Sequence, residues 1–169
     1  KAEVENYGIG GDIVLRAEPT VLAVDEIFIQ TSVRNQMLTA DLELRNGSIS
    51  GNADFTFSVI DKKGKTVLKQ HFLRPLKANA EEVFSFSIPW KDPILWEYRD
   101  PTLYTLKTEV SAGGFYDVRN DRFGFREFRI SGRNFLLNEK PFRLRPVLIE
   151  QTPLGSAPEV LKAYYRSVM

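Results

Sequence analysis

The segment from Tyr116 to Arg145 reads YDVRNDRFGFREFRISGRNFLLNEKPFRLR and carries the most regular pattern in the chain. Within it, Phe123 and Phe125 alternate with small or charged residues, the period of two that is typical of a β-strand with one buried face. We therefore expect both phenylalanines to be core residues. Their neighbours Arg122 and Arg126 are expected to point to solvent.

The pattern changes its parity further along the same segment. Phe128 and Ile130 alternate in the opposite phase, which a single strand permits only with an extra residue, so we expect a bulge near residues 126–127. Residues 131–132 and 138–141 are typical turn sequences. The segment therefore predicts a long strand, a short hairpin and an exit strand.

Alternating segments separated by turn residues also fill most of the chain before residue 116. Residues 38–44 place Leu or Ala at every second position, and residues 55–59 do the same with Phe and Val. Similar segments lie at residues 12–18, 26–33, 67–72, 83–88 and 103–110. No helical period is found before residue 155, so the pattern predicts an all-β fold, a sandwich or a barrel.

Composition argues against several kinds of site and partner. The chain has 169 residues, 23 basic and 22 acidic, with a formal net charge of +1, so we expect neither nucleic acid nor a membrane as a partner. The absence of cysteine excludes disulfides and thiolate metal sites, and leaves a periplasmic and a cytoplasmic location equally open. His71 is the only histidine, and no phosphate-binding or metal-binding motif is present, so we expect no cofactor and no metal.

Residues 89–101, PWKDPILWEYRDP, differ from the rest because they hold three prolines and two tryptophans. Such a sequence cannot continue a strand, and we expect a structured loop. Trp90 and Trp96 are open to two interpretations. They are either apolar caps on one end of the sandwich or, with Tyr98 and Tyr104, an aromatic platform on which a sugar ring stacks.

Four motifs resemble, in order and spacing, those of glycoside hydrolase family 2. Residues 95–106 match the pattern LW-x-x-x-x-P-x-LY-x-L, and residues 123–127 read FGFRE. Residues 135–141, FLLNEKP, resemble the family's FxLNGKP, and residues 8–13, GIGGDI, resemble its GIW-x-DV junction. The resemblance covers about residues 8–145.

In that family the corresponding segment is an immunoglobulin-like β-sandwich between a sugar-binding jelly roll and a catalytic (β/α)8 barrel. Together with the alternating segments, the resemblance implies an antiparallel sandwich of about seven to nine strands over residues 12–130. The family's enzymes are retaining β-glycosidases, such as β-galactosidases, β-glucuronidases and β-mannosidases, which use two carboxylates about 5–5.5 Å apart. In the family both lie on late barrel strands, so we expect no catalytic residue within this chain.

The resemblance also implies a division of the chain, which begins with lysine and which we expect to be a processed chain or an excised fragment. Residues 1–11 are expected to be a linker from a preceding jelly roll, residues 12–145 the sandwich, and residues 146–169 a truncated first βα unit of the barrel. In the tail, an apolar stripe at helical spacing is formed by Val160, Leu161, Tyr164, Tyr165 and Val168. A C-terminal helix packed on the sandwich is the alternative.

Three places depart from the family's pattern. Gly10 replaces an aromatic residue of the entry motif, and residues 146–151 replace a segment whose polar groups approach the substrate, so the substrate class is not inherited. Glu139 stands where the turn motif has glycine, although a type I′ turn needs positive φ at both central residues.

Three functional classes remain open. The first is a non-catalytic structural domain of a family 2 glycosidase, whose partners would be the parent's other domains and its carbohydrate substrate. The second is a stand-alone carbohydrate-binding or adhesion module with a platform at Trp90, Trp96 and Tyr98. The third is an enzyme in its own right, for which Glu97 and Asp100 are the available pair. Contact with neighbouring domains is the expected use of Arg119, Arg122, Arg126, Arg129, Arg133, Arg143 and Arg145.

Overall fold

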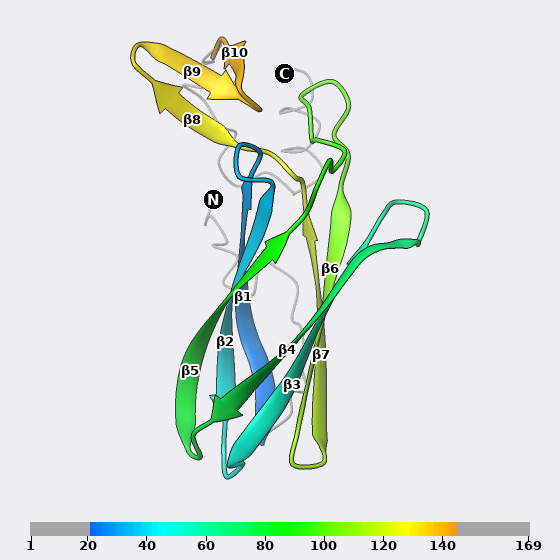
Figure 1. Cartoon of the computed structure of the whole chain (residues 1–169), viewed down its shortest axis with the longest axis vertical. Coiled ribbons are helices and arrows are strands. Elements are labelled where there is room, and N and C mark those ends of the chain that lie inside the picture. Colours follow the sequence, from blue (N-terminus) through cyan, green and yellow to red (C-terminus); the bar gives the residue numbers. More distant parts are fainter. Residues whose placement is uncertain (1–20, 145–169) are drawn as a thin grey trace, which may run out of the picture.

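The computed structural model describes residues 21–144, and in this part of the chain it contains ten strands and no helix (Figure 1). The long strands are β1 (Leu22–Ser32), β2 (Met37–Asn46), β3 (Gly51–Ile60), β4 (Thr66–Leu76), β5 (Ala80–Pro89), β6 (Tyr104–Ala112) and β7 (Phe115–Phe123). Three short strands follow them: β8 (Phe128–Ser131), β9 (Asn134–Leu137) and β10 (Lys140–Phe142). The first strand, linker and strand-helix tail expected at residues 1–20 and 145–169 lie outside the described residues.

The seven long strands form an immunoglobulin-like antiparallel β-sandwich. One sheet has the order β1-β2-β5 and the other β4-β3-β6-β7, and the chain crosses between them after β2, after β4 and after β5. The short strands form a third sheet of order β10-β9-β8 beyond one end of the sandwich, close to the turn that joins β1 to β2 (Figure 1). The all-β prediction is confirmed. Within residues 21–144 no helix is long and apolar enough to cross a lipid bilayer.

The core lies between the two large sheets and contains the predicted rows. The four apolar residues at alternate positions 38–44 of β2 are buried, and so are Phe55, Phe57 and Val59 of β3. Phe86 of β5 packs between the two β3 phenylalanines, with ring centroids 5.0 Å from Phe55 and 4.8 Å from Phe57. These tilted aromatic contacts connect the sheets, and each stabilises the fold by about 0.5–1.5 kcal/mol beyond the area it buries.

Strand β1 is longer than its alternation predicts because it contains a bulge. Its register with β2 shifts between Val24 and Glu26. Leu22 and Val24 are buried before the shift and Ile27 after it, so the buried parity changes at Asp25. A search for a period of two therefore detects only the second half of the strand.

Side chains connect the edges of the two sheets where β1 and β7 run past each other. The carboxylate of Asp117 accepts a hydrogen bond from the backbone N–H of Val24 at 2.8 Å. At the other end of β1, the hydroxyl of Thr31 donates to the carbonyl oxygen of Arg126 at 2.6 Å and accepts from its N–H at 3.2 Å. These contacts satisfy a backbone group of the edge strand β1 and two backbone groups of the connector that follows β7.

The bulge predicted at residues 126–127 is wrong. Strand β7 ends at Phe123, and the chain then leaves the sandwich through residues 124–127 and begins β8 in another sheet at Phe128. Phe125 is fully buried in the sandwich core, as predicted, whereas Phe128 and Ile130 are exposed on the third sheet. The parity changes because the two halves of the segment belong to sheets with different buried sides.

Candidate functional site

The three sequence motifs that follow residue 90 meet where the third sheet joins the sandwich. The loop between β5 and β6, the connector at residues 124–127 and the β9–β10 turn all contribute to this junction. This junction sets the position of the third sheet and is the candidate functional site.

Trp90 belongs to the core and not to a surface platform. Its ring is buried and makes edge-on contacts with Tyr104, at 4.8 Å between centroids, and with Phe125, at 5.2 Å. Tyr104 is buried too, and its hydroxyl accepts from the N–H of Ile94 at 3.0 Å, which anchors the loop. The prediction that Trp90 caps one end of the sandwich is confirmed, and the alternative platform that includes Trp90 and Tyr104 is wrong.

Trp96 is half-buried and its surroundings are built by the FGFRE motif. The guanidinium of Arg126 lies over the indole at 4.5 Å from a ring centroid. Gly124 lies so close that a Cβ there would be only 2.8–2.9 Å from Trp96 side-chain atoms, so no larger residue fits without movement. Tyr98 is exposed, while the Trp96 ring has Arg126 over it, so the structure does not assemble the proposed platform at these residues.

Asn138 connects the three motifs through one buried side chain. Its side-chain amide donates to the carbonyl oxygen of Trp96 at 2.8 Å, and its side-chain oxygen accepts from the N–H of Glu127 at 3.0 Å. Its own N–H donates to the carbonyl oxygen of Glu127 at 2.8 Å. Because buried polar groups need partners, this set of bonds specifies one position for the β9–β10 turn.

Glu127 fastens the connector to the turn between β1 and β2. Its carboxylate accepts from the Ser32 hydroxyl at 3.1 Å, from the Arg34 N–H at 3.1 Å and from the Arg34 guanidinium at 2.6 Å. Burial alone would raise the pKa of the Glu127 carboxyl, but the hydrogen bonds from Arg34 and Ser32 outweigh it and hold the pKa below its ordinary range. The side chain is only 10% exposed and stays ionised at neutral pH.

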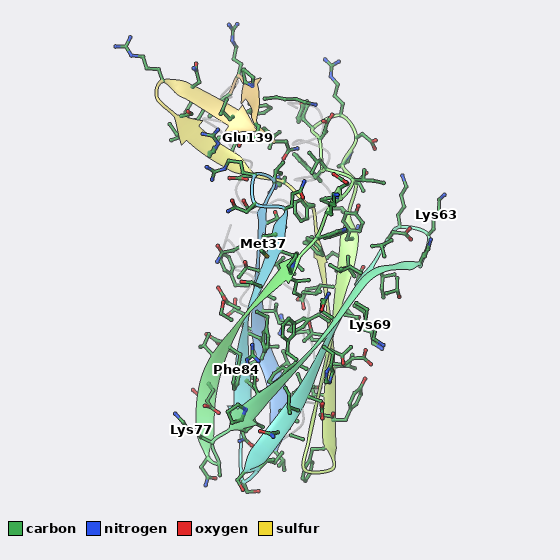
Figure 2. The ribbon with its side chains drawn as sticks, viewed as in Figure 1. Met37, Lys63, Lys69, Lys77, Phe84 and Glu139 are labelled. Carbon is green, nitrogen blue, oxygen red and sulfur yellow. The ribbon has the colours of Figure 1, made fainter. Side chains whose placement is uncertain are left out.

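Glu139 occupies the turn position where glycine was expected. Asn138 and Glu139 both have positive φ, 51° and 63°, as a two-residue type I′ turn requires. The Glu139 carboxylate forms a bidentate pair with Arg129, at 2.7 and 2.5 Å, and lies 3.6 Å from Arg34. The hydrogen bond from Arg129 lowers the pKa of Glu139. Figure 2 places Glu139 between the third sheet and the β1–β2 turn, so its charge contacts both parts.

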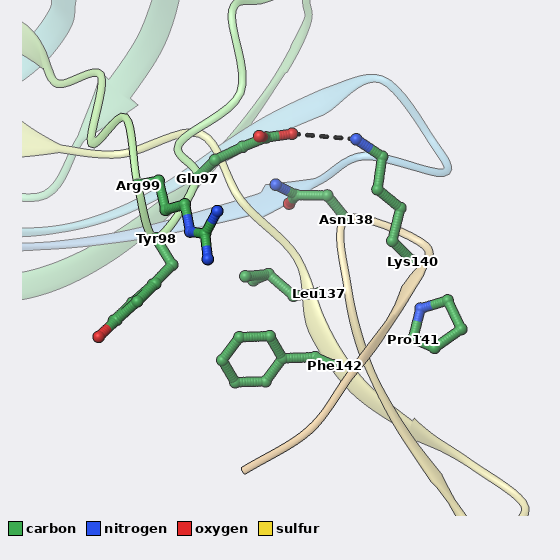
Figure 3. A pocket seen from close by; sticks show the side chains of 8 residues that line it. All are labelled: Glu97, Tyr98, Arg99, Leu137, Asn138, Lys140, Pro141 and Phe142. Carbon is green, nitrogen blue, oxygen red and sulfur yellow. Dashed lines mark hydrogen bonds and ion pairs between the residues drawn. The ribbon is translucent and has the colours of Figure 1, made fainter. Parts of the chain in front are cut away.

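A cleft of about 260 Å³ opens between the loop and strands β9 and β10. Figure 3 shows Lys140 reaching across it to the Glu97 carboxylate, at 3.1 Å, while Tyr98 directs its hydroxyl away from Lys140. Asp100 is tied to Glu97 by two backbone hydrogen bonds, which form a tight turn. Nothing in this geometry pairs the Glu97 and Asp100 carboxylates as an acid and a base.

The remaining candidate residues lie apart from the junction. His71 is exposed and contacts Asp54 at 2.8 Å on the outer side of the four-stranded sheet. Within residues 21–144 no group of three or more histidine or carboxylate side chains is placed to hold a metal ion. Arg119 pairs with Asp121 and Arg129 with Glu139. Of the other arginines expected to contact neighbouring domains, Arg122, Arg126, Arg133 and Arg143 are exposed, and Arg145 lies outside the described residues.

The third sheet carries an apolar face that the sandwich does not cover. The register places Phe128 opposite Leu137, and Phe135 opposite both Ile130 and Phe142, so all five side chains share one face. The rings of Phe128 and Phe135 stack at 5.8 Å between centroids. Ile130 is 67% exposed, and Phe128 and Phe135 are exposed as well. Such a clustered apolar patch is typical of an interaction surface.

Sequence reasoning missed Ser32 and Arg34. They lie in and beside the β1–β2 turn, 95 and 93 residues before Glu127, and no short-range pattern connects them to it. Asn138 was recognised only as a turn residue. The sequence signal that could have identified Asn138 as a junction residue is its position in the FLLNEKP motif.

Comparison with known proteins assigns the family. A family model described as "Glycosyl hydrolases family 2" matches residues 22–126, more than half of the chain. The chain belongs to glycoside hydrolase family 2. The match starts at β1 and ends within the FGFRE motif, so it covers the whole sandwich.

Relatives of this family 2 chain include two bacterial β-galactosidases. The one from Thermoanaerobacterium thermosulfurigenes is 37% identical over 97 residues, which are 57% of this chain and 13% of that protein. The one from Leuconostoc mesenteroides is 28% identical over 121 residues, which are 70% of this chain and 10% of that protein. The chain therefore spans only a small part of the curated relatives it matches.

Solved structures support the same fold. A glycosyl hydrolase family 2 member from Bacteroides cellulosilyticus superposes with a TM-score of 0.63 at 22% identity, covering 70% of this chain and 16% of that one. A calcium-binding mutant of Bacteroides uniformis β-glucuronidase 2 superposes with a TM-score of 0.58 at 28% identity, covering 79% and 17%.

Proposed function

We propose that this chain contains the non-catalytic structural domain of a larger retaining β-glycosidase, and that the third sheet packs on another domain of that parent. The observation that carries the proposal is the exposed apolar face of Phe128, Ile130 and Phe135. Burying such a face against a partner removes apolar area from water, which stabilises association by about 25 cal/mol per Å² before other costs are subtracted.

The junction supports this role because it holds the third sheet in one orientation. Asn138 and Glu127 are buried or nearly so and hydrogen-bonded to backbone groups of the loop, the connector and the β1–β2 turn. A sheet fixed in this way offers a partner a preformed surface, so little ordering cost is added when the two associate.

The charges at the junction do not support a catalytic role for it. A retaining glycosidase needs one carboxyl group that keeps a proton at working pH as the general acid. The pKa values of Glu127 and Glu139 are both lowered by arginine contacts, so neither keeps a proton at neutral pH. Each therefore acts as a fixed anion that positions arginine.

We assign residues 1–11 to a linker from a preceding sugar-binding domain, residues 12–145 to the sandwich with its third sheet, and residues 146–169 to the first βα unit of a catalytic barrel. The parent's substrate would be a carbohydrate, and its partners in this arrangement are its own other domains. The matched segment makes up 13% of the Thermoanaerobacterium β-galactosidase and 10% of the Leuconostoc β-galactosidase. Relatives of this length support a parent with several further domains.

Hydrolysis assays on the isolated chain test the absence of catalysis. Nitrophenyl β-galactoside, β-glucuronide and β-mannoside should each be cleaved no faster than in buffer. Turnover above buffer that disappears in Glu97→Gln or Asp100→Asn, with the fold intact, would place catalysis in this chain and overturn the proposal.

A further inference from the structure

A hollow of about 580 Å³ lies beside the junction, where the end of β1 approaches the connector after β7. Its walls come from Gln30 and Thr31 of β1, from Trp96 of the loop, and from Arg122, Gly124 and Arg126. It is separate from the apolar face of the third sheet, whose residues do not line it.

The hollow has two positive charges and no negative one. Arg122 and Arg126 both line it, and no aspartate or glutamate does. Among residues 21–144 neither arginine forms an ion pair with a carboxylate, whereas Arg34, Arg119 and Arg129 each do. Two arginines without a counter-ion in one hollow repel each other, and an anion bound between them removes that repulsion.

Arg126 is held in place before any ligand arrives. Its guanidinium lies over Trp96 at 4.5 Å, and its backbone N–H and carbonyl oxygen both bond to the Thr31 hydroxyl. A guanidinium that stacks on an aromatic ring through its face keeps N–H groups at its edge available for hydrogen bonds. The close packing of Gly124 on the indole fixes the ring that supports it.

We propose that this hollow is a binding site for a carboxylate group, which Arg126 and Arg122 bind together. A carboxylate matches the planar fork of a guanidinium and accepts two parallel N–H bonds from it. The same group occurs on a uronic acid and on the side chain of an aspartate or glutamate, and titration with one compound of each kind separates these sources. The site does not depend on the third sheet packing on another domain.

The test is a titration of the chain, followed through backbone amide resonances at a constant ionic strength of about 0.15 M to suppress non-specific pairing. The probes are sodium glucuronate, N-acetyl-aspartate amide and, as an uncharged control, glucose. The variants are Arg126→Gln and Arg122→Gln. Arg133→Gln is the matched control, because Arg133 is an exposed arginine in the β8–β9 turn, away from the hollow.

We expect saturable shifts at Gly124, Arg126 and Thr31 with both carboxylates and none with glucose. Arg126→Gln should weaken binding about 10-fold or more, since a charge-assisted hydrogen bond is lost, while Arg133→Gln leaves it unchanged. Glucuronate that binds much more tightly than the blocked aspartate identifies a uronic acid as the ligand, and equal affinity identifies an acidic side chain. Linear, unsaturable shifts, or equal weakening by Arg133→Gln, would overturn the proposal.

Discussion

The side-chain amide of Asn138 donates a hydrogen bond to the carbonyl oxygen of Trp96, 42 residues earlier, at 2.8 Å. This bond joins the β9–β10 turn to the loop that plugs the sandwich. The same side chain also accepts from the N–H of Glu127, so one buried residue contacts both the loop and the connector and helps to set the position of the third sheet. The relationship explains why a sheet of three short strands has a defined place on the domain.

Replacing Asn138 should therefore be costly. Asn138→Ala removes both side-chain bonds, leaves two partly buried backbone groups unpaired, and places alanine at positive φ, so we expect a loss of about 2–4 kcal/mol in the free energy of unfolding. Denaturant unfolding measures it. The control is Asn134→Ala at an exposed position of β9, which should change stability by no more than about 0.5 kcal/mol. Equal effects would mean that the Asn138 bonds contribute nothing.

Gly124 should not tolerate a side chain while Trp96 is present. A Cβ at 2.8–2.9 Å from the indole forces the ring or the backbone to move, and we expect Gly124→Ala to cost about 1–3 kcal/mol. The same substitution in a Trp96→Gly background should cost at least about 1 kcal/mol less, because the clashing Cβ, Cγ and Cδ1 atoms of Trp96 are all absent there. If the double-mutant cycle shows no coupling, the close contact is not what selects glycine here.

Much of the sandwich was predictable because its signal is local. A period of two places residues 38–44 and 55–59 on the core side, and the structure buries them there. Phe123, the last residue of β7, is buried for the same reason, and Phe125 keeps that parity and is buried although it lies in the connector. The period is a property of one strand against one core, so it works wherever a strand stays in one sheet.

The junction was not predictable in the same way. The change of parity at Phe128 was interpreted as a bulge, although it marks the passage to a third sheet. The partners of Glu127 lie in and beside a turn more than ninety residues away. Glu139 adopts a φ of 63°, which is an unfavourable backbone conformation for glutamate. In this conformation the Glu139 carboxylate forms an ion pair with Arg129. Contacts of this range depend on the assembled fold, and no local pattern encodes them.

Acid should weaken the junction through Glu127. The pKa of this carboxyl is lower in the folded protein than in the unfolded chain. Its contribution to stability is therefore complete above the pKa of the unfolded state and is lost as the pH falls through the pKa of the folded state. Unfolding midpoints at about pH 7 and about pH 3.5 should differ more in the wild type than in Glu127→Gln.

At neutral pH, Glu127→Gln should lower stability by about 1–3 kcal/mol, since a nearly buried, hydrogen-bonded charge is replaced. Glu43→Gln, on the exposed side of β2, is the charge-matched control. An acid sensitivity that is the same in wild type and Glu127→Gln would show that the Glu127–Arg34 contact is not the origin of the effect.

One pair of variants in the complete parent tests the proposed role of the third sheet as a contact surface with another domain. Ile130 lies on the apolar face of the third sheet at 67% exposure, and Val83 lies on the outer side of β5 at 68% exposure. In the isolated chain, Ile130→Asp and Val83→Asp should both leave the melting temperature nearly unchanged, because both side chains are exposed there. In the parent, thermal unfolding should show a fall of several degrees for Ile130→Asp and none for Val83→Asp, since only the first buries a charge in an interface. Equal melting temperatures for the two variants in the parent would show that the third sheet is not buried against another domain.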